Sequence, residues 1–372
     1  MDEGPNELLK SAVAEAVGGR VTALGEIKRT PLEYDAFLAH RSVSRVRGIA
    51  AVGGTDVEWS MIEKRTEGPG LATSYLLDNG AREFDAYASG VLDDIAPGVA
   101  APRLYGSELD SEGGRTLWLE EIGHDGTRPL DAETILAAAH DLGQMGGRWV
   151  GRELAEPWYF TEWIDRHSQP EAVERGLRSL REARPATSAR LGDRLVAAER
   201  LVLEQARYRS FLESLPHTLC HHDAVGANLF RSDSRTVLID WESIGAGPVG
   251  ADLASLLFSS VRRGDARAGV VVPIVDEAVN RYSEALRAEA GHITPEEIRL
   301  GFDAAIALRW KLAADIVAGM DAGHPPRRGS LPGEEPAAAL EDLIALLDLL
   351  LNSAERARKR ALSQLSANPR PG

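Results

Sequence analysis

Four polar residues in the middle of the sequence have types and spacing that suit phosphoryl transfer. His221, Asp223 and Asn228 form the pattern H-x-D-x-x-x-x-N, and Asp240 follows twelve residues after Asn228. In such a site one carboxylate meets a substrate hydroxyl, while an amide oxygen and a second carboxylate hold Mg²⁺ against phosphates. The pattern therefore predicts a kinase-type active site.

The residues between Asn228 and Asp240 predict how these two side chains meet. Leu229 and Phe230 are apolar, residues 232–235 form a polar turn, and residues 236–239 are mostly β-branched or apolar, which is typical of a β-hairpin. Asn228 and Asp240 would then lie at neighbouring ends of paired strands and could share one cation. Mg²⁺ prefers few protein ligands, oxygen donors and phosphate oxygens, so this pair suits a magnesium nucleotide.

The stretch 217–256 resembles the catalytic segment of aminoglycoside phosphotransferases and their relatives in the protein-kinase-like fold, such as choline and homoserine kinases. The resemblance implies that Asp223 is the catalytic base or hydroxyl-orienting residue, and that Asn228 and Asp240 are metal ligands. It also implies that Asp252 braces the catalytic loop, and we expect His221 to support the same loop. The run at 224–227 departs from the His-Pro-Gly-like sequence of many relatives, so the shape of the substrate-side loop stays open.

A lysine and a glutamate upstream complete the expected nucleotide site. Residues 57–64 have the pattern of a strand that ends in Lys64, and Glu83 lies where a helix is expected to begin. The strand resembles the third strand of the kinase N-lobe, whose lysine reaches the α- and β-phosphates, and a Lys64–Glu83 ion pair would hold the ammonium in place. Arg65 and Arg82 are the nearest alternatives for these two roles.

Five strands are expected in the first third of the chain, at residues 21–24, 43–51, 57–64, 102–106 and 116–120. The resemblance implies that they form a five-stranded antiparallel sheet accompanied by a helix. Glu121 and Ile122 would then form the hinge, where main-chain groups hydrogen-bond the edge of adenine or guanine; the choice between ATP and GTP stays open. The expected nucleotide-covering loop, residues 29–41, contains no glycine, and its role is also open.

After the hinge the pattern becomes helical. Asp131 is expected to cap a helix that buries Ile135, Leu142 and Met145. Further helices are expected at residues 171–182, 188–213, 275–290, 295–320 and 336–350. We therefore predict an α+β, two-lobed protein-kinase-like fold, with an N-lobe at 1–121 that binds nucleotide. A mostly helical C-lobe at 122–372 would carry the catalytic hairpin and the substrate site.

A glycine pattern in the same region supports a different class of protein. Gly245, Gly247 and Gly250 spell G-x-G-x-x-G after an expected strand, and Asp276 lies beyond a run of three valines at 270–272. This order is compatible with a dinucleotide-binding oxidoreductase. Pro273 would interrupt the second strand of such a unit, and Asp223 would have no role in it. A glycine-rich turn into the next helix is the alternative.

Composition narrows the choice of partners and compartment. The 372 residues carry a formal net charge of −15, which opposes nucleic-acid binding and is compatible with a cationic substrate or with simple solubility. Cys220 is the only cysteine, so no internal disulfide can form; we expect it to pack as a small apolar residue in a cytoplasmic protein. No signal-peptide pattern or membrane span is expected.

The functional hypothesis is ATP- or GTP-dependent phosphorylation of a small-molecule hydroxyl with Mg²⁺. An aminoglycoside or another antibiotic-like compound is the acceptor class that the resemblance favours. A metabolic alcohol or sugar kinase and a non-catalytic kinase-like binding protein are alternatives. Trp241, Glu242 and Trp310 are candidates for substrate recognition, and His222 could face substrate or pack in the interior. Oligomeric state is not predicted.

Overall fold

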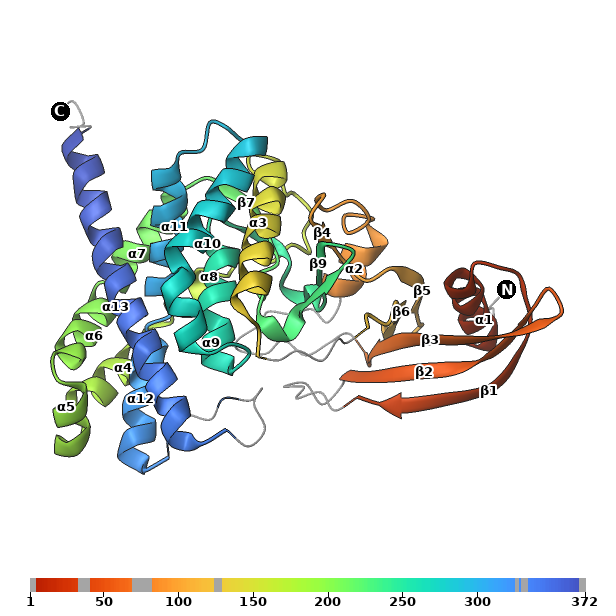
Figure 1. The fold of residues 1–372 in the computed structure, drawn as a ribbon, viewed down its shortest axis with the longest axis horizontal. Coiled ribbons are helices and arrows are strands. Elements are labelled where there is room, and N and C mark those ends of the chain that lie inside the picture. The colour runs from red at the N-terminus through yellow and green to blue at the C-terminus, as the bar shows by residue number, and fades with distance from the viewer. Residues whose placement is uncertain are drawn as a thin grey trace. The chain divides into compact units, whose positions relative to one another are not determined.

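The computed structural model describes residues 5–32, 41–68, 82–123, 129–324, 328 and 334–367. The chain divides into two compact units, and Figure 1 shows its elements in chain order. The first unit comprises Met1–Ile95, Ala100–Asp125 and Val237–Glu242, and the second comprises Ala96–Val99, Gly126–Thr236 and Ser243–Gly372. The six residues 237–242, which contain Asp240, therefore belong to the same unit as Lys64.

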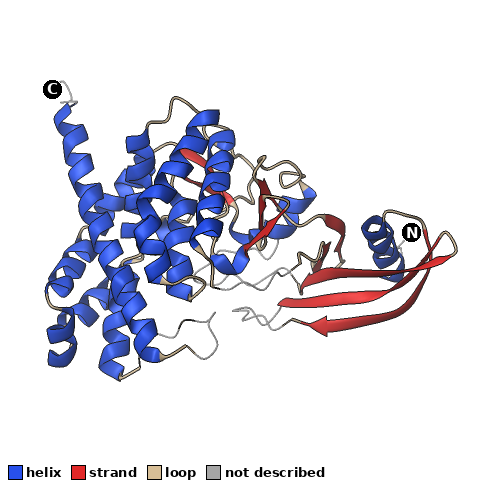
Figure 2. Cartoon of the chain, in the orientation of Figure 1, coloured by secondary structure: helices blue, strands red, loops and turns tan. Residues whose placement is uncertain are grey.

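The first unit is built on a five-stranded antiparallel sheet in the order β1-β2-β3-β6-β5. Short helices accompany the strands, which are drawn in red in Figure 2. All five strands lie where the sequence predicts them, and the first reaches Pro31, seven residues further than expected. The elements are α1 (Pro5–Val17), β1 (Val21–Pro31), β2 (Arg41–Val52), β3 (Thr55–Thr66), α2 (Arg82–Ala88), β5 (Leu104–Leu109) and β6 (Arg115–Leu119).

Helix α1 covers one face of this sheet. Its spacing of apolar residues places Leu9, Ala12 and Val13 on one stripe, as expected for a period of 3.6 residues, and all three are buried. They pack against side chains from four strands in a single apolar cluster, which comprises Leu9, Ala12, Val13, Val21, Val46, Ala50, Trp59, Met61 and Trp118.

The second unit is mostly helical, as the preponderance of coiled ribbons in Figure 2 shows. Helices α3 and α10 run side by side (Figure 1). Gly143 and Gly147 of α3 permit a very short separation, since a Cβ atom added at either position would lie 2.4 Å from a carbonyl oxygen of α10. The helices are α3 (Ala132–Trp149), α4 (Pro170–Arg181), α5 (Pro185–Leu191), α6 (Asp193–Leu203), α7 (Gln205–Ser214), α8 (Ala251–Ala254), α9 (Ser260–Arg263), α10 (Ala268–Glu289), α11 (Pro295–Ala307), α12 (Lys311–Ala322) and α13 (Pro336–Ala367).

Short strands flank the motif of His221, Asp223 and Asn228. Strand β7 (His217–Cys220) precedes it and pairs antiparallel with β10 (Gly245–Pro248). Strands β8 (Leu229–Ser232) and β9 (Arg235–Leu238) follow it and share a sheet with β4 (Val99–Ala100). Asp233 and Ser234 join β8 to β9 with φ angles of 48° and 64°, the left-handed conformation that a tight two-residue hairpin turn requires. The predicted hairpin is thus present.

The predicted α+β class, with a five-stranded antiparallel sheet and a mostly helical remainder, is confirmed. Two expected helices are divided. The span 188–213 forms parts of α5, α6 and α7, because Gly192 adopts φ 54° and ends α5, and the span 295–320 is divided between α11 and α12 at residues 308–310. Within the described residues no helix combines the length and apolar character needed to span a membrane.

The dinucleotide-binding alternative does not fit this fold. Residues 270–272 lie inside α10, where that alternative needs a second strand. Gly245 and Gly247 lie in an antiparallel strand and not in a phosphate-binding turn. These glycines permit close packing, since a Cβ atom at Gly245 would lie 2.0 Å from the carbonyl oxygen of Phe160. The pattern G-x-G-x-x-G therefore has a structural cause here.

Candidate active site

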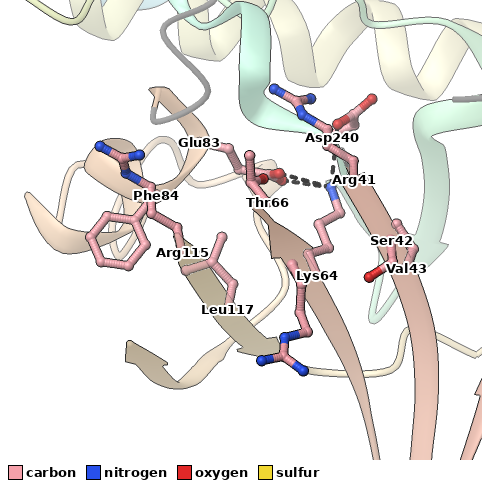
Figure 3. Close-up of a pocket in the computed structure, with 11 residues that line it drawn as sticks. Arg41, Ser42, Val43, Lys64, Thr66, Glu83, Phe84, Arg115, Leu117 and Asp240 are labelled. Carbon is pink, nitrogen blue, oxygen red and sulfur yellow. Dashed lines mark hydrogen bonds and ion pairs between the residues drawn. The ribbon is translucent and has the colours of Figure 1, made fainter. Parts of the chain in front are cut away.

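The first unit contains an ion cluster around Lys64. The Lys64 ammonium lies 2.8 Å and 2.9 Å from the two carboxylate oxygens of Glu83 and 3.2 Å from Oδ1 of Asp240, as the dashed lines in Figure 3 show. The three side chains are 19%, 13% and 18% exposed, so water screens their charges only in part. The structure thus brings together three residues that the sequence pattern assigned to nucleotide and metal binding.

Strand register explains why Lys64 and not Arg65 reaches this cluster. Lys64 of β3 lies opposite Val43 on β2 and Leu117 on β6, and residues opposite each other in a sheet project to the same face. Successive residues alternate, so Arg65 projects to the other face and is exposed. Arg82, the alternative to Glu83, instead donates a hydrogen bond of 2.8 Å to the carbonyl oxygen of Glu242.

The backbone at Asp240 has a conformation that aims its carboxylate at Lys64. Its φ is 65°, in the left-handed region that Asp tolerates better than most residues and that is common at functional sites. The next residue, Trp241, is fully buried and donates from its indole nitrogen to Leu238 at 2.7 Å. The main-chain nitrogen of Trp241 also donates to Glu83 at 3.3 Å. Trp241 is therefore a core residue that anchors Asp240.

These residues line a pocket where β2 and β6 begin and β3 ends. Its walls include Glu83 and Phe84 from α2, and Figure 3 shows Lys64, Glu83, Arg41 and Asp240 gathered at one end. The full set is Arg41, Ser42, Val43, Lys64, Arg65, Thr66, Glu83, Phe84, Arg115, Leu117 and Asp240. An apolar floor of Val43 and Leu117 beside a charged end suits a ligand with a flat apolar part and an anionic part.

The predicted hinge residues follow β6 as irregular chain. The Glu121 carboxylate accepts hydrogen bonds from Ser60 and from Arg45 and Arg47 of β2. Burial alone would raise the pKa of Glu121, but the hydrogen bonds from Ser60 and Arg45 and the charges of both arginines hold it below its usual value. Ile122 is half-buried, and the next residues, 124–128, lie outside the described part of the chain.

The second unit holds the predicted catalytic motif through a buried carboxylate. Asp252 is 3% exposed, and its two oxygens accept hydrogen bonds of 2.8 Å from the main-chain nitrogens of His221 and His222. His221 in turn accepts a hydrogen bond from the main-chain nitrogen of Asp223 at its Nδ1 atom, at 3.2 Å. The chain leading into Asp223 is therefore tied to the interior through His221 and His222.

Asn228 lies directly against Asp223. The Asn228 amide nitrogen donates to the carbonyl oxygen of Asp223 at 3.0 Å and to its Oδ2 atom at 2.9 Å. Because the nitrogen is used in this way, Oδ1 of Asn228 is the atom that could coordinate a cation. Asn228 ends a short 3₁₀ turn, Gly226–Asn228, whose main-chain nitrogen at Gly226 donates to Ser260 at 2.9 Å. The loop 224–227, which departs from the His-Pro-Gly-like sequence of many relatives, is thus held in place by a hydrogen bond to Ser260.

The side chains of His222 and Cys220, next to the motif, are buried in the interior. His222 is 1% exposed, stacks on Trp163 with ring centroids 5.4 Å apart, and donates from Nε2 to the carbonyl oxygen of Ala246 at 3.1 Å. Burial raises the pKa of the Cys220 thiol well above its usual value, with a further contribution from Asp252. The expectation that Cys220 packs as an apolar residue agrees with this environment, and His222 is packed as well.

Cys220, His222 and Asp252 also place three possible metal-ligand atoms within 4.8 Å of one another. Burial raises the pKa of the Asp252 carboxyl, although His221, His222 and Arg309 act in the opposite direction. The raised pKa of the Cys220 thiol favours its protonated form, whereas a cation requires a thiolate. Both carboxylate oxygens already accept hydrogen bonds. We therefore assign this group a structural role.

Two arginines near the predicted residues are not part of the sequence motifs. Arg263, the last residue of α9, lies 3.4 Å from Oδ2 of Asp223. Arg41, the first residue of β2, forms an ion pair with Glu242. Glu242 is thus engaged by Arg41, and Trp310, the other candidate for substrate recognition, is buried and donates to His167 at 3.0 Å. Local sequence carries no signal for these long-range contacts.

A lysine on the third strand paired with a glutamate of the following helix is the arrangement that kinases use to hold nucleotide phosphates. The sequence agrees with this class: the model of the phosphotransferase enzyme family matches residues 77–292, which is more than half of the chain. The protein therefore belongs to the phosphotransferase enzyme family. The match includes Glu83, Asp223, Asn228, Asp240 and Asp252 and begins after Lys64.

Among solved structures, the chain is similar to choline kinase from Cryptosporidium parvum Iowa II, with 10% identity, 97% of each chain covered and a TM-score of 0.47. It is also similar to an aminoglycoside phosphotransferase from Alicyclobacillus acidocaldarius, with 10% identity, 94% and 96% coverage and a TM-score of 0.49. A choline/ethanolamine kinase family protein from Mesorhizobium loti has 15% identity, 97% and 99% coverage and a TM-score of 0.46. No curated protein sequence matches the chain at a significant level.

Proposed function

We propose that this protein transfers a phosphoryl group from ATP or GTP to a hydroxyl of a small molecule, with Mg²⁺ as the metal. The observation that carries the proposal is the Lys64–Glu83 pair next to Asp240 in one pocket. Membership of the phosphotransferase enzyme family supports it. An oxidoreductase function has no support, because the residues it needs as a second strand are helical.

On the nucleotide side, Lys64 would bind phosphate oxygens while Glu83 keeps the ammonium in position. Val43 and Leu117 would contact the base, with main-chain groups of Glu121 and Ile122 at its edge. Asp240 and Asn228, the two predicted metal ligands, would each offer an oxygen donor of the kind that Mg²⁺ prefers. When bound, the ion would offset the negative charge of the phosphates.

On the acceptor side, Asp223 would orient the substrate hydroxyl and accept its proton. Asn228 holds the Oδ2 atom of Asp223 at 2.9 Å, which leaves Oδ1 as the oxygen for the hydroxyl. His221 and Asp252 would act as positioning residues, because they fix the main chain around Asp223. General-base assistance of this kind contributes about 100- to 10,000-fold to a rate.

The acceptor class is proposed from charge. The net charge of −15 favours a cationic compound, and an aminoglycoside or related antibiotic is the first class to test. Arg263 is a specific observation in favour of the second class, since its guanidinium 3.4 Å from Asp223 would repel a polycation close to the reacting hydroxyl. Neutral metabolic alcohols and sugars are therefore the second candidate acceptors.

The test is a screen of acceptors for stimulated release of ADP or GDP in the presence of Mg²⁺. Aminoglycosides, other antibiotics, alcohols and sugars form its arms. Asp223→Ala should abolish stimulated release while ATP or GTP affinity stays close to that of the unaltered protein. A variant that retains full turnover would refute Asp223 as the base. Nucleotide binding without transfer to any acceptor would instead support the non-catalytic alternative.

A further inference from the structure

We infer that Arg41 is a second phosphate-binding cation of the nucleotide pocket and that Glu242 holds it in place when no phosphate is present. The inference rests on the proposed function, because it assumes that the pocket around Lys64 binds a nucleotide. It concerns only residues of the first unit, all of which are described.

The register of the sheet places Arg41 beside the Lys64 cluster. Arg41 lies opposite Thr66, and Val43 lies opposite Lys64, in the antiparallel pair β2–β3. Positions 41 and 43 are two residues apart, so both side chains project to the face that carries Lys64. Arg41 lines the same pocket as Lys64 and Asp240, and Figure 3 shows its side chain at the charged end.

The partner of Arg41 ties it to the predicted metal ligand. Arg41 pairs with the carboxylate of Glu242, and the two side chains are 15% and 10% exposed. Glu242 follows Asp240 by two residues, and the carbonyl oxygen of Glu242 accepts a hydrogen bond of 2.8 Å from Arg82. The ion pair therefore joins the start of β2 to the segment that carries Asp240.

The charges in the pocket explain why a second cation is needed. Lys64 carries one positive charge and contacts two carboxylates, those of Glu83 and Asp240. A nucleoside diphosphate or triphosphate adds further negative charge at the same place. In kinases, main-chain nitrogens of a glycine-rich loop help to hold these phosphates, but residues 29–41 contain no glycine, and Pro31 lacks an N–H group. A guanidinium at position 41 would supply donors by a different route.

The other arginines of the pocket are directed elsewhere. Arg65 alternates to the opposite face of the sheet and is exposed, and Arg115 donates to the carbonyl oxygen of Gly113 at 2.8 Å. Arg41 lines the pocket, and its present partner is the carboxylate of Glu242. Two oxygens of a phosphate can accept hydrogen bonds from a guanidinium in the same bidentate way as the two oxygens of a carboxylate, so phosphate oxygens can replace Glu242 as the partner.

The experiment compares ADP with AMP, and GDP with GMP, by calorimetric titration in the presence of Mg²⁺. For Arg41→Ala we expect the diphosphate of the preferred base to bind about 10- to 100-fold more weakly, whereas the monophosphate changes less than about threefold. The diphosphate affinity of Arg41→Lys should lie between those of the unaltered protein and Arg41→Ala, because an ammonium keeps the charge but lacks the paired N–H donors of a guanidinium. Lys28→Ala, which removes a charge from an exposed position of β1, is the matched control and should bind all four nucleotides as the unaltered protein does.

Glu242→Gln provides a test that does not depend on the stability of the Arg41 variants. It should strengthen diphosphate binding several-fold, and the gain should vanish in the double variant with Arg41→Ala. Equal weakening of monophosphate and diphosphate by Arg41→Ala, unaltered diphosphate binding in that variant, or no gain in Glu242→Gln would each overturn the inference. If the unaltered protein binds none of the four nucleotides, the proposed function itself fails.

Discussion

The ammonium of Lys64 lies within 2.9 Å of both carboxylate oxygens of Glu83, across nineteen residues of sequence. Lys64→Met removes the charge that we propose binds phosphate, and we expect the turnover rate to fall by about 100- to 1,000-fold, as for the loss of other preorganised electrostatic groups. Glu83→Gln keeps a hydrogen-bond acceptor for Lys64, so its turnover rate should fall less than that of Lys64→Met. Steady-state kinetics with the identified acceptor measure both, with Lys28→Met as a control for charge. Full activity of Lys64→Met would contradict the assignment.

Asp252 should be essential for the stability of the catalytic loop. Asp252→Ala leaves the buried main-chain nitrogens of His221 and His222 without their acceptor, and each unsatisfied group costs about 1–3 kcal/mol. We expect a loss of about 2–5 kcal/mol in urea unfolding, and a smaller loss for Asp252→Asn, which retains one carbonyl oxygen. Asp193→Asn, at an exposed position in the same unit, should change the free energy of unfolding by less than about 0.5 kcal/mol. Similar changes in the free energy of unfolding for Asp252→Ala and Asp193→Asn would show that the hydrogen bonds of Asp252 contribute little to stability.

The start of α3 offers a prediction that depends on pH. Asp131 caps this helix by accepting a hydrogen bond of 2.8 Å from the main-chain nitrogen of Thr134, as expected from the sequence, and this bond lowers the pKa of Asp131. Asp131→Ala should cost about 0.5–2 kcal/mol at pH 7. Because the folded-state pKa is lowered, this stability is present above the unfolded value of about 3.9 and is lost as the pH falls through the folded value.

The difference in melting temperature between the unaltered protein and Asp131→Ala should therefore shrink from pH 7 to pH 3. An equal difference at both pH values would mean that the carboxylate charge has no part in the cap. Asp131→Asn, which retains a side-chain oxygen at the N-cap and does not titrate, should stay close to the unaltered protein at pH 7 and keep its advantage over Asp131→Ala at pH 3.

Cys220 should be unreactive in the folded protein. The thiol is buried and its pKa is raised well above the usual value, so a thiol reagent at pH 8 should label it only after unfolding in urea. The raised folded-state pKa also means that the stability contributed by the neutral thiol is complete below the unfolded value of about 8.5 and is lost as the pH rises towards the folded one. Cys220→Ala should remove this alkaline loss. Rapid labelling of the native protein would contradict the packed position.

Much of the candidate site could be predicted because its parts are short in sequence. The pattern of His221, Asp223 and Asn228 lies within eight residues, and the hairpin after it is indicated by a polar turn between two apolar runs. The five strands and the cap at Asp131 follow equally from local preferences. The roles of these residues in catalysis are still predictions, to be decided by the experiments above.

The boundaries of the long helices were harder to predict from the sequence. Glycine at position 192 could continue or end a helix, and its φ of 54° is set by the turn between α5 and α6. The three glycines at 245–250 are compatible with a phosphate-binding turn or with a packed strand, because glycine has no side chain that distinguishes them. The close approach of Phe160 to Gly245 decides in favour of the strand.

The sequence by itself determined the family and the fold class, and it predicted which residues bind phosphate, metal and a hydroxyl, since these depend on residue type and short spacing. Only the tertiary structure decided that Lys64, which was expected to pair with Glu83, also contacts Asp240, that Arg41 meets Glu242, and that Arg263 lies beside Asp223. Arg41 and Glu242 are separated by 201 residues. Contacts at such separations depend on how strands pair and on which face each side chain projects from, and no local pattern encodes either.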